Sequence, residues 1–197
     1  MKSSLKFCLV ALFATLITGS AFADQTNDSR FFVSADLGIF TRADNSLPNN
    51  NVLFDYGAKL GFSALDLGFS KLGFAVTYDR NRRSADIGVS SSAYVDLNNI
   101  DLQVLFLNIA GTGIYAGPIA GVLIATDGLD LSAQDLGLAS GVSGSQTSVY
   151  FTAGLAAGFD VAILDCLSVG PEVRYEHIFG DVKGNDLRFL GDVTYRF

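Results

Sequence analysis

The sequence predicts an all-β fold, an eight-stranded antiparallel up-and-down transmembrane β-barrel. Three observations favour this fold. Apolar and polar residues alternate over stretches of about ten residues, which is the pattern of strands with one apolar face. The connections between these stretches are alternately long and short, as they are in barrels that cross membranes. The chain also ends on an aromatic residue, Phe197, directly after the last of these stretches.

The first 23 residues have the pattern of a secretory signal peptide. Lys2 and Lys6 precede an apolar run, and Ala21-Phe22-Ala23 has the A-x-A form of a cleavage site. The apolar run is too short for a membrane anchor, because a spanning helix needs about 20 apolar residues. We therefore predict cleavage after Ala23, and the domain limits that follow are a signal peptide over residues 1–23, a linker over residues 24–30 and a barrel over residues 31–197.

The charge and cysteine content of the exported chain exclude two classes of protein. Loss of residues 1–23 removes two of the 13 basic residues and none of the 20 acidic ones, which changes the net charge from −7 to −9. Such a chain is not expected to bind nucleic acid, which requires a basic surface. Cys166 is the only cysteine left after cleavage, so the chain is not a secreted domain held together by internal disulfides.

The first half of the chain predicts four strands, over residues 31–40, 53–62, 71–80 and 99–107. In the first of them Phe31, Val33 and Leu37 share one face, whereas Ser34 and Asp36 share the other. Because successive side chains of a strand point to opposite faces, each stretch predicts a strand with one apolar and one polar face.

The second half predicts four more strands, over residues 113–124, 147–159, 167–177 and 187–197. Three of them alternate as before. The segment 113–124 is apolar on both faces, so alternation does not assign its register. Pro118 within it removes one hydrogen bond of the ladder.

Long connections alternate with short ones along the chain. The long ones are predicted over residues 41–52, 81–98, 125–146 and 180–186, and the short ones over residues 63–70, 110–113 and 160–166. Alternate connections of an up-and-down barrel lie at the same end, so this pattern places long loops at one end and short turns at the other. A soluble barrel of the lipocalin kind, with its apolar face turned inward, is the alternative.

Charged residues fall on the polar faces that the barrel would enclose. They are Lys59, Lys71, Arg174, Arg188, Arg196, Asp36, Asp55, Asp79, Asp101, Glu172, Glu176 and Asp192. An eight-stranded barrel is just wide enough for side chains to fill it, and an unpaired charge inside it is costly. We therefore predict an interior ionic network that contains Lys59, Asp101, Glu172, Arg174, Glu176 and Arg196.

The predicted network has two interpretations. It either only fills the barrel, or it acts as a gate that admits ions. In the gate, Lys59 or Arg174 would change its partner between Glu172 and Glu176.

No residue pattern in the sequence predicts catalysis or a cofactor. His177 is the only histidine, and no second histidine or paired cysteine offers a metal site. Asp127, Asp130 and Asp135 do not have the spacing of an EF-hand. The basic residues 80–83 begin a long connection, where they would meet either solvent or lipid phosphates. We therefore predict a protein that is not an enzyme and has no cofactor and no metal site.

The last residues resemble the carboxy-terminal signature of bacterial outer-membrane barrels, which the barrel-insertion machinery reads. Val193, Tyr195 and Phe197 are apolar residues at alternate positions that end on an aromatic, as in that signature. The chain departs from the signature at its glycine, because Gly191 stands one position early and Asp192 occupies the usual place.

Residues 31–197 as a whole resemble the small eight-stranded outer-membrane proteins, the OmpA-domain and OmpX-like group. The segments LSVGPEVRYEH (167–177) and LRFLGDVTYRF (187–197) are similar to the ends of such domains. The resemblance implies a monomer in a Gram-negative outer membrane, in contact with its lipid and lipopolysaccharide and assembled by the barrel-insertion machinery. It also implies a structural or surface-exposed role, in which long loops adhere to or contact host surface molecules.

Three alternatives remain beside that role: a narrow porin-like channel, an outer-membrane lipid-modifying enzyme and a soluble periplasmic ligand-binding barrel. An open lumen lined by glycine would favour the channel. Lipid A deacylases on this scaffold use a His and a Ser two residues apart, together with a Glu. In this chain Phe179 stands two residues after His177, so the enzyme would need a serine brought close in space.

Overall fold

The computed structural model describes residues 31–42, 53–86, 91–131, 142–180 and 184–197. The predicted signal peptide and linker, residues 1–30, lie outside this part of the chain. The described residues form nine strands and one 3-10 turn: β1 (Phe31–Arg42), β2 (Leu53–Asp66), β3 (Lys71–Asp86), β4 (Ser92–Leu107), η1 (Ile109–Gly111), β5 (Ile114–Leu131), β6 (Val142–Phe159), β7 (Val161–Leu164), β8 (Leu167–Phe179) and β9 (Gly184–Arg196).

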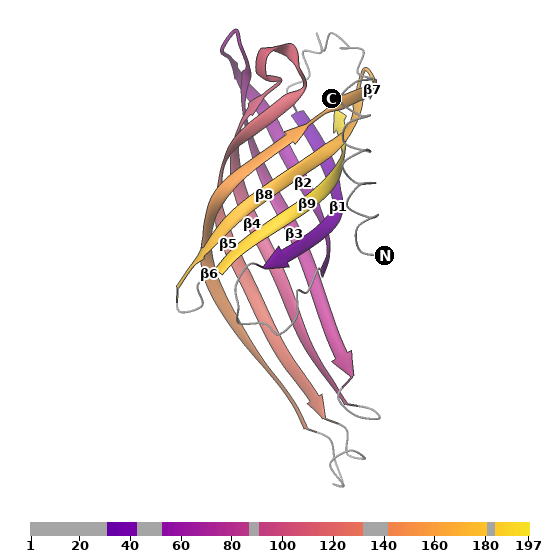
Figure 1. The fold of residues 1–197 in the computed structure, drawn as a ribbon, viewed down its shortest axis with the longest axis vertical. Coiled ribbons are helices and arrows are strands. Elements are labelled where there is room, and N and C mark those ends of the chain that lie inside the picture. Colours follow the sequence, from indigo (N-terminus) through magenta and orange to yellow (C-terminus); the bar gives the residue numbers. More distant parts are fainter. Residues whose placement is uncertain (1–30, 43–52, 87–90, 132–141, 181–183) are drawn as a thin grey trace, which may run out of the picture.

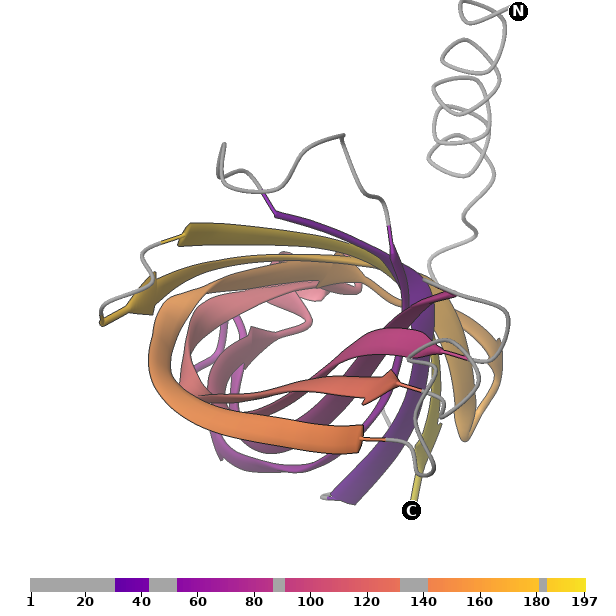
Figure 2. The ribbon, with the colours of Figure 1, turned by 90° about the horizontal axis from the view of Figure 1, so that it is seen from below.

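Eight antiparallel strands close into a ring, seen along its axis in Figure 2. The pairing of β1 with β9 and of β6 with β8 completes the circle. The short β7 is not a ninth member, because its pairing with β8 from Val161↔Val169 continues the register of the β6–β8 ladder, which ends at Gly158↔Glu172. Strands β6 and β7 are therefore one barrel strand interrupted at Asp160. The predicted eight-stranded up-and-down barrel is confirmed.

The strands are staggered around the ring. Beginning at Phe32, the successive cross-strand partners are Gly61, Ala75, Gln103, Ile119, Gly154, Glu176, Asp186 and Arg42. Following the cross-strand partners once around the ring therefore starts at position 32 of β1 and returns to the same strand at position 42. A stagger of this size in eight strands tilts them by roughly 40° from the barrel axis and leaves an interior that side chains fill.

The described turns between strands all lie at one end of the barrel (Figure 1). The turns over residues 67–70, 108–113 and 165–166 lie at one end, which we call the short-turn end. Phe31 and Phe197 exchange two backbone hydrogen bonds at this end. The turn before β8 comprises only Asp165 and Cys166, so the prediction of a connection over all of residues 160–166 was wrong. Strands β1, β3, β5 and β8 end at the opposite end, which we call the long-loop end after the predicted long connections. Residues 184–186 of the predicted connection 180–186 belong to β9.

Four neighbouring strands are longer than predicted. Strands β3 and β4 have 16 residues and β5 and β6 have 18, whereas β1, β2, β8 and β9 have between 12 and 14. Figure 1 shows β3–β6 projecting past the ring as a sheet. We name this sheet, residues 81–86, 92–97, 125–131 and 142–150, the extension. The predicted connections 81–98 and 125–146 are thus largely strand. Alternation did not predict this, because most described side chains of the extension are exposed or half-buried on both faces, although Asn81 and Leu97 at its base are buried.

Several residues that the sequence assigned to loops therefore lie in strands. The basic residues 80–83 lie in β3, and Asp127 and Asp130 lie in β5 rather than in a loop. Asp135 lies outside the described residues.

The structure assigns the register of β5 that the sequence left open. Tyr115, Ile119 and Leu123 are buried in the lumen, whereas Pro118 is exposed on the outer face. The β4–β5 pairs on either side of Pro118, Gln103↔Ile119 and Phe106↔Ala116, share one register. The proline therefore interrupts the ladder locally without shifting it.

The apolar faces of the strands point outward. Leu60, Leu102 and Leu155 are 60%, 65% and 62% exposed, whereas Asp101 and Arg174 are completely buried. This arrangement contradicts the soluble ligand-binding barrel, whose apolar face would line the interior. Among the described residues, no helix is long and apolar enough to cross a membrane.

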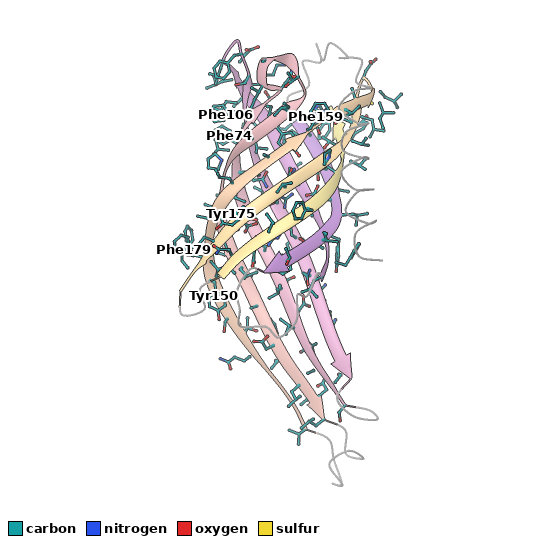
Figure 3. The ribbon with its side chains drawn as sticks, in the orientation of Figure 1. Phe74, Phe106, Tyr150, Phe159, Tyr175 and Phe179 are labelled. Carbon is teal, nitrogen blue, oxygen red and sulfur yellow. The ribbon has the colours of Figure 1, made fainter. Side chains whose placement is uncertain are left out.

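Aromatic side chains form a band on the outer face near the short-turn end. The ring of Phe31 lies 6.2 Å from that of Phe197 and 6.2 Å from that of Phe62, which in turn lies 5.6 Å from that of Phe74. Figure 3 shows Phe74 toward this end and Phe179 toward the other. Aromatic bands of this kind flank the apolar belt of membrane barrels at the two membrane interfaces.

Candidate functional site in the barrel lumen

Arg174 lies at the centre of the lumen and binds three carboxylates. Its Nη2 lies 2.6 Å from Oδ2 of Asp36, and its Nη1 lies 2.5 Å from Oδ2 of Asp79. Its Nε donates to Glu172, which stands two residues earlier on β8 and so faces the same way. All four side chains are buried, so three strands are joined by charged hydrogen bonds away from water.

Lys59 forms a second group on the short-turn side of Arg174. Its ammonium contacts Glu172 and lies 3.2 Å from Oδ2 of Asp192. The hydroxyl of Tyr115 donates to the same two carboxylates, at 2.5 Å from Glu172 and 2.8 Å from Asp192. Glu172 therefore accepts from Lys59, Tyr115 and Arg174 together.

Arg188 forms a third group on the long-loop side. Its Nη1 lies 3.1 Å from Asp79 and 3.2 Å from Glu176, and its Nε lies 3.4 Å from Asp55. The amide of Asn99 donates to both Glu176 and Asp101, at 2.8 Å and 2.7 Å. The three groups form one network, because Asp79 and Glu172 each belong to two of them.

Apolar clusters cover the network at both ends of the lumen. Toward the short-turn end lie the buried residues Phe32, Ala75, Leu105, Tyr115, Ile119 and Ala156. Toward the long-loop end lie Phe40, Leu97, Leu123 and Ile178. The described lumen is therefore filled with side chains, and a channel would require the network and both clusters to move.

The structure brings together five of the six predicted network residues. Lys59, Asp101, Glu172, Arg174 and Glu176 lie in the three groups described above. Arg196 does not join them, because it lies near the short-turn end and binds Asp160 and the hydroxyl of Ser168, 2.7 Å away. Lys71 also lies apart, at the wall of a cavity of about 70 Å³ near the same end.

Sequence reasoning missed two polar residues of the network, Tyr115 and Asn99. Tyr115 was missed because alternation did not fix the register of β5. Asn99 is the first residue of its predicted strand, and alternation did not assign its side chain to the lumen. Asp186 is also buried in the lumen, although it was assigned to a loop.

The predicted terminal signature lies on the outer face. Val193, Tyr195 and Phe197 are 48%, 46% and 60% exposed and point toward the surroundings of the barrel. The ring of Phe197 stacks on those of Tyr195 and Phe31, so the last residue belongs to the aromatic band.

His177 does not form a catalytic pair with a serine in the described part of the chain. Its Nδ1 lies 2.8 Å from Oδ1 of Asn185, and its ring packs edge-on against Phe179 at 4.7 Å. The described residues also contain no group of three or more His, Cys, Asp or Glu side chains placed to hold a metal ion.

The fold is that of known outer-membrane proteins. Neisserial surface protein A (NspA) matches with a TM-score of 0.56 and 17% identity, over 85% of this chain and 97% of that one. Ail, the attachment invasion locus protein of Yersinia pestis, matches with 0.57 and 15%, over 86% and 99%. A major outer membrane protein of Thermus thermophilus matches with 0.54 and 13%, over 87% and 100%. The chain has the fold of a small outer-membrane β-barrel.

The fold and the outward apolar belt agree on the location of the protein. A closed ring with apolar residues outside and charges inside is suited to hydrocarbon, because closure lets the strands pair their backbone groups with one another around the whole ring. The barrel lies in the bacterial outer membrane. In barrels of this kind the short turns face the periplasm and the longer connections face the outside of the cell. No family model and no curated protein matches the sequence, so the roles of individual residues follow from this structure.

Proposed function

We propose that the protein is a surface-exposed outer-membrane barrel whose extension contacts molecules outside the cell, host surface molecules among them. The observation that carries this proposal is the extension itself. It continues four strands beyond the ring at the extracellular end, where neither membrane nor lumen requires them (Figure 1).

The β6 edge of the extension is open to a partner strand. In the described pairings, residues 151–158 of β6 pair with β8, whereas residues 142–150 pair with β5 alone. The open segment, VSGSQTSVY, contains no charged residue and no proline, the features that usually protect an edge strand from pairing. An extended segment of another protein can therefore add to this edge through backbone hydrogen bonds.

The outer face of the extension offers positive charge to anionic partners. Arg80, the ring residue of β3 next to the extension, is already paired, because it forms two hydrogen bonds with Asp96. Within the extension, the guanidinium of Arg82 lies 5.2 Å from the centre of the Tyr94 ring on an exposed surface. Lipopolysaccharide and sulfated host polymers both carry negative charge. Ail, a structural neighbour at 16% identity and a TM-score of 0.52, has been solved in complex with the heparin analogue sucrose octasulfate.

The proposal extends to assembly and oligomeric state. The outward-facing Val193, Tyr195 and Phe197 are available to the barrel-insertion machinery before the ring closes. We infer a monomer, because the ring pairs its own strands completely and leaves the open edges only on the extension. The proposed role includes no catalysis, since His177 is occupied by Asn185.

The experiment is a host-cell adhesion assay with bacteria that display the protein. The test variant carries Ser145→Lys and Thr147→Lys, which place charge on the open edge of β6. The control is Thr126→Lys, on the adjacent central strand β5 and opposite Thr147 in the ladder. We expect adhesion above that of bacteria lacking the protein, a large loss for the edge variant and little loss for the control. Adhesion that does not exceed the background, with the barrel present at the surface, contradicts the proposal.

A further inference from the structure

The buried lumen contains more acids than bases. Among the described residues, the carboxylates that are at most 2% exposed are Asp36, Asp55, Asp79, Asp101, Glu172, Glu176, Asp186 and Asp192. The buried bases are Lys59, Arg174 and Arg188. Even with Asp186 set aside, seven acids face three bases. An uncompensated charge in such an environment is unfavourable by several kcal/mol, so further positive charge has to accompany the acids.

The surplus is concentrated around Arg188. Asp55, Asp79, Asp101 and Glu176 lie within 4.0 Å of its guanidinium. Arg174 contributes to this group through Asp79 alone. The region therefore keeps a net negative charge when all of its carboxyl groups are ionised.

A small cavity lies beside this group. Its volume is about 10 Å³, roughly what a single water-sized particle requires. Asp55, Asp79, Asn81, Asn99, Asp186 and Arg188 line it on the polar side. Phe40, Leu97 and Leu123, which belong to the apolar cluster at the long-loop end, complete the lining.

Four oxygen atoms of the lining residues have no hydrogen-bond donor among the described residues: Oδ2 of Asp55 and the Oδ1 atoms of Asp79, Asn81 and Asn99. The Nε of Arg188 has no hydrogen-bond acceptor and lies 3.4 Å from Oδ2 of Asp55, so the Oδ1 atoms of Asp79, Asn81 and Asn99 are the ones left without a partner in the described part of the chain. Their residues are 2%, 4% and 1% exposed. The two amides are oriented by their nitrogen atoms, because Nδ2 of Asn81 donates to the carbonyl of Phe54 and Nδ2 of Asn99 donates to two carboxylates. Each amide therefore presents its oxygen where a donor or a cation is needed.

We propose that this cavity binds a monovalent metal cation such as potassium. Carboxylate and amide oxygens are the ligands of hard cations. A divalent ion is disfavoured, because the positively charged guanidinium of Arg188 also lines the cavity. The cavity offers three carboxylates and two neutral amides to a monovalent ion, which removes one unit of the charge surplus. Bound protons are the competing source of positive charge.

The test compares the thermal unfolding midpoint of the barrel, refolded in detergent micelles, in potassium chloride and in choline chloride at equal ionic strength. Choline is too large for the cavity. We expect the midpoint to rise by roughly 3–6 °C at tenfold the dissociation constant and to keep rising with the logarithm of potassium concentration above it. Equal midpoints in the two salts overturn the proposal. A midpoint that follows pH but not potassium assigns the charge to protons and overturns it equally.

Two variants connect the effect to the cavity. Asn81→Ala removes one of the unpartnered oxygens and should abolish most of the potassium-dependent rise, whatever its effect on stability in choline. Asn98→Ala is the control, because Asn98 faces outward and bonds Tyr78 and Asp96 instead. If Asn81→Ala does not fold, crystals of the unaltered protein soaked in thallium(I) provide the readout. An anomalous peak between Asp79, Asn81 and Asn99 is expected, and its absence at full soaking overturns the proposal.

Discussion

Arg174 and Arg188 bind the same oxygen of Asp79. The Nη1 atom of Arg174 lies 2.5 Å from Oδ2, and that of Arg188 lies 3.1 Å from it. Asp79 thereby links the central group of the lumen to the group nearest the long-loop end, and it joins β3 to β8 and β9 across the interior. The stability of the ring depends on how the charges of this network balance.

The charge balance predicts unequal effects for the two partners of the Arg174–Asp79 pair. Arg174→Met leaves three buried carboxylates without their guanidinium and increases the acid surplus. We expect it to reduce the free energy of unfolding by about 3–5 kcal/mol, the usual cost of removing one partner from a buried pair. Asp79→Asn removes one surplus charge and should cost less. Urea unfolding in lipid vesicles, followed by circular dichroism, measures both, and an equal or larger loss for Asp79→Asn would argue against a surplus.

Arginine substitutions of two equally exposed apolar residues should change the free energy of unfolding differently, because one residue lies within the membrane and the other outside it. Leu102 and Val149 are 65% and 64% exposed, but Leu102 lies in the ring and Val149 in the extension. Arginine near the middle of the bilayer costs about 2–4 kcal/mol. We expect a loss of that size for Leu102→Arg and almost none for Val149→Arg in the same vesicle unfolding experiment. Similar losses at both positions would show that the lipid-facing belt does not end between Leu102 and Val149.

The terminal signature predicts an assembly defect without a comparable folding defect. Phe197→Ala should reduce the fraction of barrel in the outer membrane that shifts mobility on heating. Phe69→Ala is a matched control, since both rings are 60% exposed near the short-turn end. The purified Phe197→Ala chain should still refold in detergent. If it fails there to the same degree, Phe197 acts through the aromatic band and not through recognition by the insertion machinery.

The Arg80–Asp96 pair predicts a defined pH dependence outside the membrane. The hydrogen bonds from Arg80 hold the pKa of Asp96 below its ordinary value of 3.8. A carboxyl whose pKa is lowered by folding stabilises the fold above its unfolded pKa, and this contribution is lost as pH falls through the folded value. The effect is small, because the pair is near solvent. Asp96→Asn should therefore differ from the unaltered protein by a constant amount between about pH 5 and 8, and the difference should disappear as pH falls through the lowered pKa of Asp96. A difference that instead changes around neutral pH would point to another group.

Alternation along the chain predicted the eight strands of the ring and the direction of most side chains. The reason is local: within the membrane one face of each strand meets hydrocarbon and the other meets the lumen, so the sequence has to alternate. The same rule failed for 113–124, where small and apolar residues such as Ile119 and Leu123 also face the lumen as part of the two apolar clusters. It failed again for the extension, where most described side chains are exposed or half-buried on both faces.

The sequence by itself determined the fold class, the number of barrel strands and most of the charges that the lumen holds. Only the tertiary structure decided which charges meet. Strands are staggered around the ring, so residues as distant in the chain as Asp36 and Arg174 come within 2.6 Å of each other, whereas Arg196 is carried to the short-turn end. Alternation assigns a side chain to a face but not to a height along the barrel axis. Height is set by the register of every ladder together, and that register exists only in the closed ring.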